Sequence, residues 1–308
     1  MKKMILRKLK DLLKKNKMKK KFIDPLINRK DNLTRNIQYY KNNIPLPSVI
    51  EISESGTCNR KCSFCPRSAP DFLDIKEFVS EDLINKLSKE LSLYDYSGIF
   101  LFSGFVEPMV DKNIYNLVSI VRDNLPKAKI EMVTNGDALN IQRVKKLFRS
   151  GLSTLLVSIY DGKKEADEME ELLQKSDLNE DQFKVRHRYL PESENFGITL
   201  SNRSGMMDKA EYVIPSLKEP MKKPCYYPHY TFFMDYTGEV LICSHDWGKK
   251  MVVGNLNNET FIDIWLNQKF NLARKNLYSA NRNFAPCDKC DVMGTLMGSV
   301  QAKAWNKV

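Results

Sequence analysis

Three cysteines stand close together in the first quarter of the chain, at Cys58, Cys62 and Cys65. Their Cys-x3-Cys-x2-Cys spacing offers three thiolates to an iron-sulfur cube, whereas a closed cluster takes four. One iron of such a cube would stay open to bind and cleave a cofactor. The spacing differs from the paired Cys-x2-Cys knuckles of structural zinc sites, and a zinc site or a disulfide is the alternative interpretation.

The other four cysteines lie beyond residue 220, at Cys225, Cys243, Cys287 and Cys290. An apolar stretch at 230–235, a turn and a second apolar stretch at 240–243 predict a β-hairpin that ends at the second of them. Seven cysteines are an odd number, and they cluster at short spacings. This pattern indicates metal or cluster ligands in a reducing compartment rather than a disulfide framework.

Alternating apolar and amphipathic segments must position the first three cysteines. The predicted strands cover residues 48–53, 98–103, 128–133, 153–159 and 183–189. The predicted helices between them cover residues 80–94, 111–124, 140–150 and 163–175. This alternation predicts an α/β fold of βα units with a parallel sheet and right-handed crossovers. No convincing helix follows the fifth strand, so we expect a truncated barrel.

Polar signals follow four of these strands in succession. The cysteine loop comes after the first strand, and residues 104–108, 134–136 and 158–162 come after the next three. Because the carboxyl ends of parallel strands meet at one edge of a sheet, we expect these segments to form a single ligand site. One such signal would be weak, since turns are routinely rich in Gly, Asn and Asp.

Composition sets the broad class of the protein. The chain has 308 residues, of which 42% are hydrophobic, and this length allows one large domain or a domain with a smaller appendage. It contains no run of eighteen apolar residues that could span a membrane. The N-terminus lacks the apolar region and cleavage site of a secretory signal, which favours a cytoplasmic location.

The positive charge is concentrated in the first 21 residues. The formal net charge is +11, and residues 1–21 contribute eleven Lys or Arg and one Asp, which leaves about +1 for the remainder. Leucine and isoleucine recur there at helical spacing opposite lysines, a pattern typical of a basic amphipathic helix on an anionic membrane surface. A solvated leader is the alternative. The segment has no aromatic residue on which a base could stack, which argues against nucleic acid binding.

The first cysteine motif and its context resemble the radical S-adenosylmethionine (SAM) enzymes. The apolar segment 49–52 runs into the loop, and Phe64 supplies the aromatic residue that this family places before its third cysteine. The resemblance covers roughly residues 48–205. It implies a partial, open βα barrel of TIM-like type and a 4Fe-4S cluster whose open iron is chelated by SAM. It also implies a reductant such as flavodoxin or ferredoxin.

Further site residues follow from this resemblance. Glu107 and Pro108 match the end of the family's Gly-Gly-Glu-Pro stretch, while Phe105 and Val106 replace its glycines and Gly104 lies one step upstream. The remaining expected SAM contacts come from later strand ends, at Asn135, Ser158, and Arg186 or Arg188. The arginines would pair with the SAM carboxylate. A turn, a helix cap or a surface charge is the alternative at each position.

The C-terminal part resembles the SPASM/twitch extension of radical SAM enzymes. Cys225, the Gly-x4-Cys pattern that ends at Cys243, and the segments 253–256 and 261–265 match it. Four cysteines fit the shorter twitch form with a second, auxiliary 4Fe-4S cluster, and a zinc site is the alternative. We therefore expect a tail and connector at 1–47, a radical SAM barrel at 48–220 and a small α+β cluster domain at 221–308.

The two cysteine groups leave no free thiol, and this favours an oxidation. Related epimerases return a hydrogen atom from a cysteine that is not a ligand, whereas twitch-type dehydrogenases of aminocyclitols resemble this chain in size and cysteine content. We expect oxidation of a carbinol in a sugar or cyclitol, free or linked to a nucleotide or lipid, with the auxiliary cluster accepting the electron. The candidate catalytic residues are His187, His245 and Tyr160.

Three other functions remain open from the sequence. An epimerase would need a hydrogen donor other than cysteine. A maturase of ribosomal peptides often has an N-terminal recognition domain of about eighty residues, and fewer than fifty residues precede the first core strand here. An electron-transfer or zinc-stabilised binding module would hold zinc, or closed clusters that do not respond to SAM.

Overall fold

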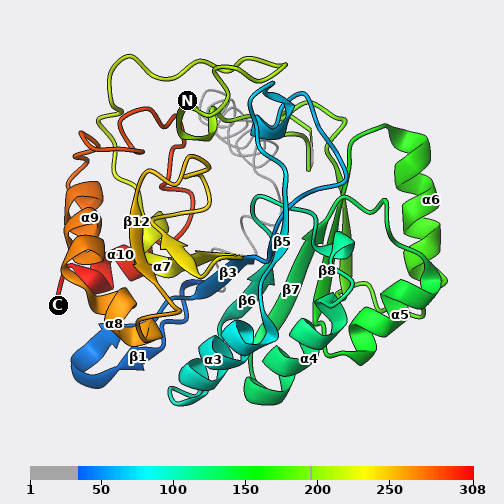
Figure 1. Ribbon diagram of the computed structural model, residues 1–308, viewed down its shortest axis with the longest axis horizontal. Coiled ribbons are helices and arrows are strands. Elements are labelled where there is room, and N and C mark those ends of the chain that lie inside the picture. The colour runs from blue at the N-terminus through cyan, green and yellow to red at the C-terminus, as the bar shows by residue number, and fades with distance from the viewer. Residues whose placement is uncertain (1–33, 195) are drawn as a thin grey trace, which may run out of the picture.

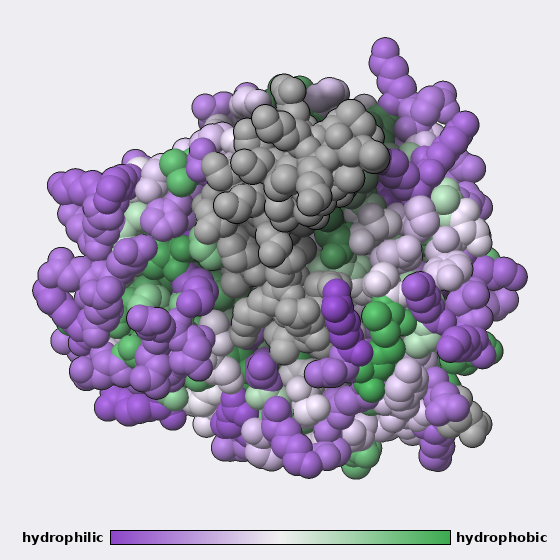
Figure 2. Space-filling model, turned by 180° about the vertical axis from the view of Figure 1, so that it is seen from behind, coloured by the Kyte–Doolittle hydropathy of each residue, from purple (hydrophilic) through white to green (hydrophobic). Residues whose placement is uncertain are grey.

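One sheet of eight strands organises the computed structural model, which describes residues 34–194 and 196–308. The strand order is β12-β11-β10-β3-β6-β7-β8-β9. The predicted tail helix at 1–21 lies outside the described residues. Within the described part of the chain, no helix is long and apolar enough to cross a membrane. Hydrophilic side chains dominate the outline of the face seen in Figure 2.

The five predicted parallel strands are confirmed. They are β3 (Val49–Ser53), β6 (Ile99–Phe102), β7 (Lys129–Thr134), β8 (Thr154–Ile159) and β9 (Phe183–His187). Each pairs in parallel with the next, for example with Val49 opposite Ile99 and Leu155 opposite Phe183. Nearly all their apolar side chains are fully buried, because helices cover one side of the sheet and the other side faces a barrel interior.

The four predicted helices are also confirmed, and they lie along the outer face of the sheet (Figure 1). They are α3 (Glu81–Ser92), α4 (Ile114–Asn124), α5 (Ile141–Arg149) and α6 (Lys163–Gln174). Ser80 and Asn140 cap α3 and α5 by accepting hydrogen bonds from the main-chain N–H of Leu83 and Arg143. The buried face of α3 consists of Leu83, Ile84, Leu87, Ser88 and Leu91.

The C-terminal hairpin joins the barrel sheet. Strand β10 (Thr231–Asp235) runs parallel to β3, with Phe233 opposite Glu51, and β11 (Glu239–Leu241) and β12 (Val252–Asn255) continue it in antiparallel fashion. The hairpin itself was predicted, but its pairing with the first barrel strand was not. The two halves of the chain therefore share one hydrogen-bonded sheet and one core.

The remaining elements are short or C-terminal. The helices after residue 220 are α7 (Tyr227–Tyr230), α8 (Phe261–Leu266), α9 (Gln268–Tyr278) and α10 (Ser299–Trp305). The other strands are β1 (Tyr39–Tyr40), β2 (Ile44–Pro45), β4 (Ser55–Gly56) and β5 (Ile75–Phe78). The 3₁₀ turns are η1 (Lys41–Asn43), η2 (Pro66–Ser68), η3 (Pro108–Val110) and η4 (Arg203–Gly205). Between β9 and α7 the described residues contain only η4, so the barrel is truncated as expected.

Candidate functional site

The first three cysteines face a cavity at the carboxyl ends of the strands. Residues 58–65, here called the cluster loop, follow β3 and β4 and place Cys58, Cys62 and Cys65 on one wall. The opposite walls come from the ends of β6, β7 and β8, and the cavity has a volume of about 160 Å³. The expected residues that line this loop cavity are Phe64, Gly104, Glu107, Asn135, Ser158 and Tyr160.

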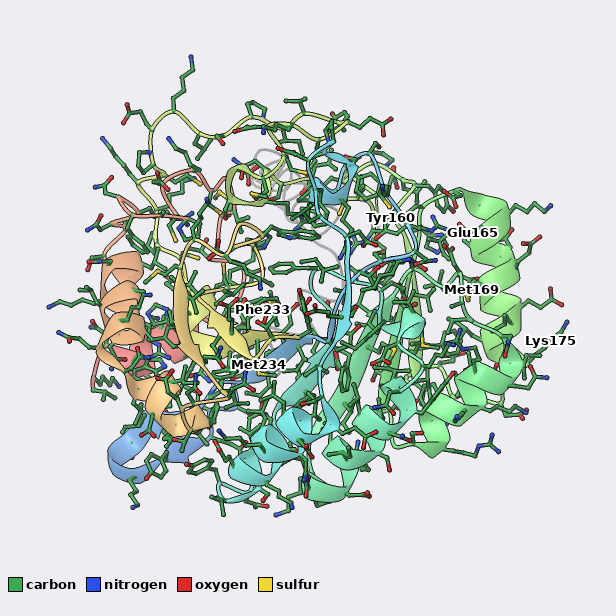
Figure 3. The ribbon with its side chains drawn as sticks, viewed as in Figure 1. Tyr160, Glu165, Met169, Lys175, Phe233 and Met234 are labelled. Atoms are coloured by element: carbon green, nitrogen blue, oxygen red, sulfur yellow. The ribbon has the colours of Figure 1, made fainter. Side chains whose placement is uncertain are left out.

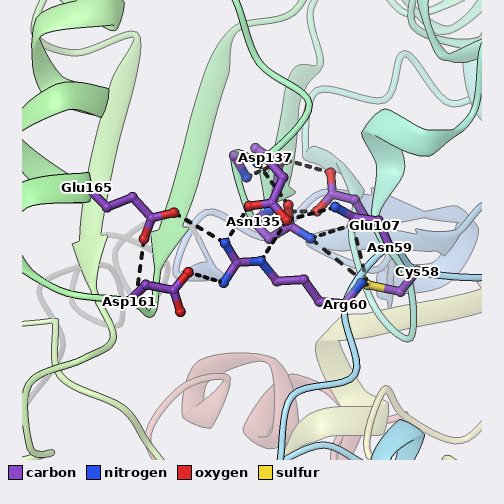
Figure 4. Close-up of polar contacts among 10 residues, drawn as sticks. Cys58, Asn59, Arg60, Glu107, Asn135, Asp137, Asp161 and Glu165 are labelled. Atoms are coloured by element: carbon purple, nitrogen blue, oxygen red, sulfur yellow. Dashed lines mark hydrogen bonds and ion pairs between the residues drawn. The ribbon is translucent and has the colours of Figure 1, made fainter.

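Arg60 anchors the cluster loop to the strand ends, as Figure 4 shows. Its Nε donates to Asp137 Oδ2 at 2.7 Å, and its two terminal nitrogens pair with Asp161 at 2.9 Å and Glu165 at 3.2 Å. The hydrogen bond to Asp137 is the main reason that the pKa of Arg60 is raised. Asn59, next to it, donates to Asp137 Oδ2 at 2.8 Å. The loop is thereby tied to both β7 and β8.

Glu107 braces the end of β7 from inside. The carboxylate is 2% exposed and accepts hydrogen bonds from Thr134 Oγ1 at 2.5 Å, the Asn135 N–H at 2.6 Å and the Met109 N–H at 3.0 Å. Burial raises its pKa, and these three donors oppose that shift. Pro108 follows as the first residue of η3. The carboxylate thus fixes the loop that carries Asn135, whose side chain donates to Asn59 at 2.7 Å.

Gly104 lies shortly after β6, one residue upstream of the two positions at which the family has its glycines. It has a φ of 101°, and a Cβ there would lie 3.0 Å from Ser53 Cβ. This conformation is costly for other residues. The next residue, Phe105, donates its N–H to Ser53 Oγ at 3.1 Å and packs its ring on Phe233 and Trp247, with centroids 4.9 and 4.6 Å apart.

A larger cavity of about 510 Å³ lies beside the cluster loop and is lined by both halves of the chain. The barrel contributes Glu51, Ser158, Arg186 and Arg188. The C-terminal part contributes Tyr227, Tyr230, His245, Trp247 and Asp291. Tyr160 and Arg203 line both this central cavity and the loop cavity. The Tyr160 ring lies 5.2 Å from that of Phe64, and Figure 3 places Tyr160 near the end of α6 that carries Glu165.

The structure separates the two candidate histidines. His245 lines the central cavity, and its Nδ1 lies 3.5 Å from an Arg203 nitrogen. Burial, with a smaller contribution from Arg203, lowers the pKa of His245 to about 3, so its imidazole is neutral. His187 does not line the cavity: its Nδ1 lies 2.9 Å from Tyr189 Oη and its Nε2 lies 3.4 Å from Glu170. The geometry therefore favours His245 as the residue that faces a substrate.

The two arginines of β9 and the turn after it also lie at the central cavity. Arg188 is 8% exposed and donates to the carbonyl oxygens of Phe196 at 3.0 Å and Gly197 at 2.5 Å. Arg188 thus shapes the wall by holding the following segment, while Arg186 lines the same cavity from β9. Phe196 has a φ of 61°, which this restraint helps to maintain.

The last four cysteines surround a small, largely apolar cavity of their own, here called the cysteine cavity. Burial raises the pKa of all four thiols, and neighbouring thiols raise the pKa of Cys225, Cys243 and Cys287 further. Within the described residues, no three His, Cys, Asp or Glu side chains are arranged around a single metal ion. All four cysteines line this one cavity, and four thiolates are the ligand set of a closed 4Fe-4S cluster.

Arg282 places a positive charge beside the cysteine cavity, where it would offset the negative charge of a bound iron-sulfur cluster. It is 1% exposed and lines the cysteine cavity. Its donors go to main-chain carbonyls, those of Lys223, Pro224, Val292 and Met293, at 2.8–3.1 Å, and to the Met221 sulfur. A buried guanidinium without a carboxylate partner among these contacts needs a nearby anion. Four thiolates and an anionic cluster would provide it.

Sequence reasoning missed Arg60, Arg203, Trp247 and Arg282. Arg60 lies inside the cysteine motif, but only the fold brings three carboxylates around it. Trp247 and Arg203 come from irregular segments without a motif. Arg282 lies between Cys225 and the pair Cys287 and Cys290 in the sequence. This position was the one sequence feature that could have indicated a role near the last four cysteines.

Comparison with known proteins agrees with this geometry. Residues 52–191 match the model of the radical SAM superfamily, and residues 225–291 match the SPASM model, an iron-sulfur cluster-binding domain. The S-adenosyl-L-methionine-dependent 2-deoxy-scyllo-inosamine dehydrogenase of Niallia circulans is 30% identical over 79% of this chain and 92% of its own length.

A solved structure is similar in both sequence and fold. The crystal structure of BtrN in complex with AdoMet and 2-DOIA superposes with a TM-score of 0.68 at 27% identity, over 83% of this chain and 98% of that one. The structure of anSMEcpe with bound AdoMet has a TM-score of 0.50 at 13% identity, over 85% of this chain and 92% of that one, and shares the fold.

Proposed function

The chain belongs to the radical SAM superfamily and carries a C-terminal SPASM iron-sulfur domain, and we propose that it oxidises a carbinol of a cyclitol or related carbohydrate. The observation that carries this proposal is the central cavity of about 510 Å³ between the two cysteine groups. Its walls present carboxylate, guanidinium, imidazole and phenol groups, which suit a small polyhydroxylated ring. The name of the Niallia circulans relative, an inosamine dehydrogenase, supports an aminocyclitol.

Each cysteine group has its own role. Cys58, Cys62 and Cys65 would hold the 4Fe-4S cluster that binds SAM, and the other four cysteines would hold the auxiliary 4Fe-4S cluster. When bound, the first cluster and SAM supply a 5′-deoxyadenosyl radical, and the auxiliary cluster supplies an electron acceptor. The proposed SAM contacts are Phe64, Gly104, Glu107, Pro108, Asn135, Ser158, Arg186 and Arg188. A flavodoxin or ferredoxin is the proposed reductant.

The oxidation balances without a free thiol. The carbinol carbon loses a hydrogen atom to become the methyl hydrogen of 5′-deoxyadenosine, the hydroxyl loses a proton, and one electron leaves as the carbonyl forms. SAM is consumed, and the electron that starts its cleavage is regained. We place the substrate hydroxyl beside His245, Arg203 and Tyr160, with the His245 imidazole as proton acceptor. The negative charge of a cluster bound at Cys243 would raise the low pKa of His245 toward the range that a base needs.

Deuterium transfer tests the proposal. Anaerobically reconstituted protein is incubated with SAM, a reductant and cyclitols or sugars deuterated at single carbinol carbons. We expect deuterium in 5′-deoxyadenosine with at least one aminocyclitol. His245→Gln should lose ketone formation about 100-fold or more, and the matched control His187→Gln should retain it. If no cyclitol or sugar transfers deuterium and a peptide does, the maturase function replaces this one.

Tyr160 supports one competing function. Its phenol lies at the boundary of the loop cavity and the central cavity, where it could return a hydrogen atom to a substrate radical. Such a return would give redox-neutral epimerisation in place of oxidation. Tyr160→Phe separates the two functions, because an epimerase would lose inversion whereas a dehydrogenase would keep its ketone product.

The basic tail carries a separate proposal about location. Residues 1–21 hold eleven Lys or Arg and one Asp, and we propose that they bind an anionic membrane surface from the cytoplasmic side. A lipid-linked substrate would lie at the membrane and would suit this location. A nucleotide-linked substrate is water-soluble and would not require the enzyme to bind a membrane. Deletion of residues 1–21 should release the protein from anionic vesicles while SAM cleavage continues. A full-length protein that ignores such vesicles at physiological salt would contradict the proposal.

A further inference from the structure

Three successive residues in η4 adopt a left-handed backbone. Arg203, Ser204 and Gly205 have φ values of 47°, 55° and 91°. The conformation suits glycine, but it is strained for each of the other two residues. A strained pair of this kind persists only where its surroundings hold it.

The turn is bound to the loop that carries Cys290. Asn202 is fully buried, and its side chain donates to the Lys289 carbonyl at 2.7 Å. Its N–H donates to Asp291 Oδ2 at 3.0 Å, and Ser201 Oγ donates to Asp291 Oδ1 at 3.0 Å. These bonds reach the residues on both sides of Cys290. The turn and the auxiliary cysteine loop therefore form one hydrogen-bonded unit.

The strained backbone points two neighbouring side chains into two different cavities. Arg203 lines the central cavity beside His245. Ser204 lines the cysteine cavity together with Cys290. A regular helical or extended turn would not fix both side chains in this way while Asn202 stays anchored. Of the residues that line the cysteine cavity, Ser204 and Tyr227 are the two that carry a hydroxyl.

We propose that Ser204 is a positioning residue whose hydroxyl donates to the Cys290 sulfur when the auxiliary cluster is bound, and that it thereby sets the reduction potential of that cluster. The inference rests on the proposed function only in taking the four cysteines as ligands of that cluster. A donor to a ligand sulfur stabilises the more negative, reduced state, so the hydroxyl raises the potential. The same turn holds Arg203 beside the proposed substrate position. One element therefore both contacts the substrate and sets the reduction potential of the cluster that accepts its electron.

The test uses full-length protein in which Cys58, Cys62 and Cys65 are changed to Ala, so that only the auxiliary cluster remains. Ser204→Ala removes the hydroxyl oxygen and keeps the β-carbon. Ser216→Ala is the matched control, because its hydroxyl, in the same segment, binds Asp208 at 2.6 Å. A redox titration followed by electron paramagnetic resonance (EPR) gives the potential, and pulsed EPR in heavy water detects the exchangeable hydroxyl proton.

With Ser204→Ala we expect the reduced-to-oxidised ratio at a fixed ambient potential to fall about two- to tenfold, the equivalent of one net hydrogen bond. One exchangeable deuteron coupling should also disappear, and Ser216→Ala should change neither. If Ser204→Ala takes up no cluster, Ser204→Gly makes the same comparison without backbone strain. An unchanged potential and deuteron coupling in the variant would overturn the proposal. No substrate is present, so the result is independent of whether the enzyme oxidises a cyclitol.

Discussion

At the scale of single residues, buried charge is concentrated around the two cysteine groups. The Glu107 carboxylate has three hydrogen-bond donors. Glu54, just after β3, is fully buried, and its two carboxylate oxygens have no hydrogen-bond partner among the described residues. Burial raises the pKa of Glu54 well above its ordinary value, and Glu107 and Asp111 raise it further. The folded protein therefore keeps Glu54 protonated over a wider range than the unfolded chain does.

The raised pKa of Glu54 predicts that the free energy of unfolding falls as the pH rises. Because the folded pKa is raised, the stability from Glu54 is fully present below the ordinary value of 4.5 and is lost as the pH rises toward the folded pKa. Glu54→Gln has no proton to lose. Above pH 4.5, the melting temperature of the variant should therefore rise relative to that of the unchanged protein. We expect about 2–4 °C for each kcal/mol of unfolding free energy that the unchanged protein loses. A difference that stays constant from acid to neutral pH would contradict this explanation.

Arg282 is predicted to be required for the auxiliary cluster. Arg282→Met removes the buried positive charge beside Cys225, Cys287 and Cys290, so iron content should fall from about eight to about four per chain. Arg122→Met is the matched control, since that guanidinium also donates to main-chain carbonyls but on the far side of the barrel helices. Iron analysis after anaerobic reconstitution decides between them, and equal iron in both variants would exclude the role.

At the scale of elements, the cluster loop is held by strands that are distant in sequence. Arg60→Ala should leave the three cysteines able to hold iron but release the loop from Asp137, Asp161 and Glu165. We expect SAM affinity to fall roughly tenfold, because misplacement of a binding group is costly. Lys61→Ala, at the exposed neighbouring position, should have no effect. Equilibrium dialysis with labelled SAM measures both variants, and an unchanged affinity in Arg60→Ala would remove the anchoring role.

The shared sheet predicts that the C-terminal part cannot be removed. Truncation after residue 220 deletes β10, which pairs along the whole of β3, and exposes the edge that carries Ile50 and Ile52. The shortened chain should aggregate or melt without a cooperative transition. A soluble fragment that melts cooperatively would instead show that residues 48–220 form an independent domain, as the sequence pattern suggested.

The elements themselves could be predicted because their signals are local. Apolar runs and amphipathic spacing predicted the five parallel strands and four helices of residues 49–187, and the cysteine spacings separated the triplet from the quartet. The pairing of β10 with β3 could not be predicted, because the apolar pattern of a hairpin does not specify which strand it pairs with. Arg203 and Ser204 were missed for a related reason: they lie in a strained turn held by residues about ninety positions away.

At the scale of the whole molecule, the central cavity shares wall residues with the cavities of both cysteine groups, Tyr160 with the loop cavity and His245 with the cysteine cavity. The cluster loop, Tyr160 and the barrel arginines form one side, and His245 with the auxiliary cysteine loop forms the other. A substrate between them would lose its hydrogen atom on one side and its electron on the other. All seven cysteines belong to one group or the other, so no thiol remains to return a hydrogen atom.

Product stoichiometry tests this central claim most directly. The reconstituted enzyme is given SAM, reductant and the cyclitol that transfers deuterium, in heavy water, and 5′-deoxyadenosine and the substrate product are quantified together. We predict one ketone for each 5′-deoxyadenosine formed, with no solvent deuterium at the reacting carbon. An inverted alcohol that carries solvent deuterium at that carbon would contradict the account, because it would show that a residue such as Tyr160 returns a hydrogen atom and that the enzyme is an epimerase.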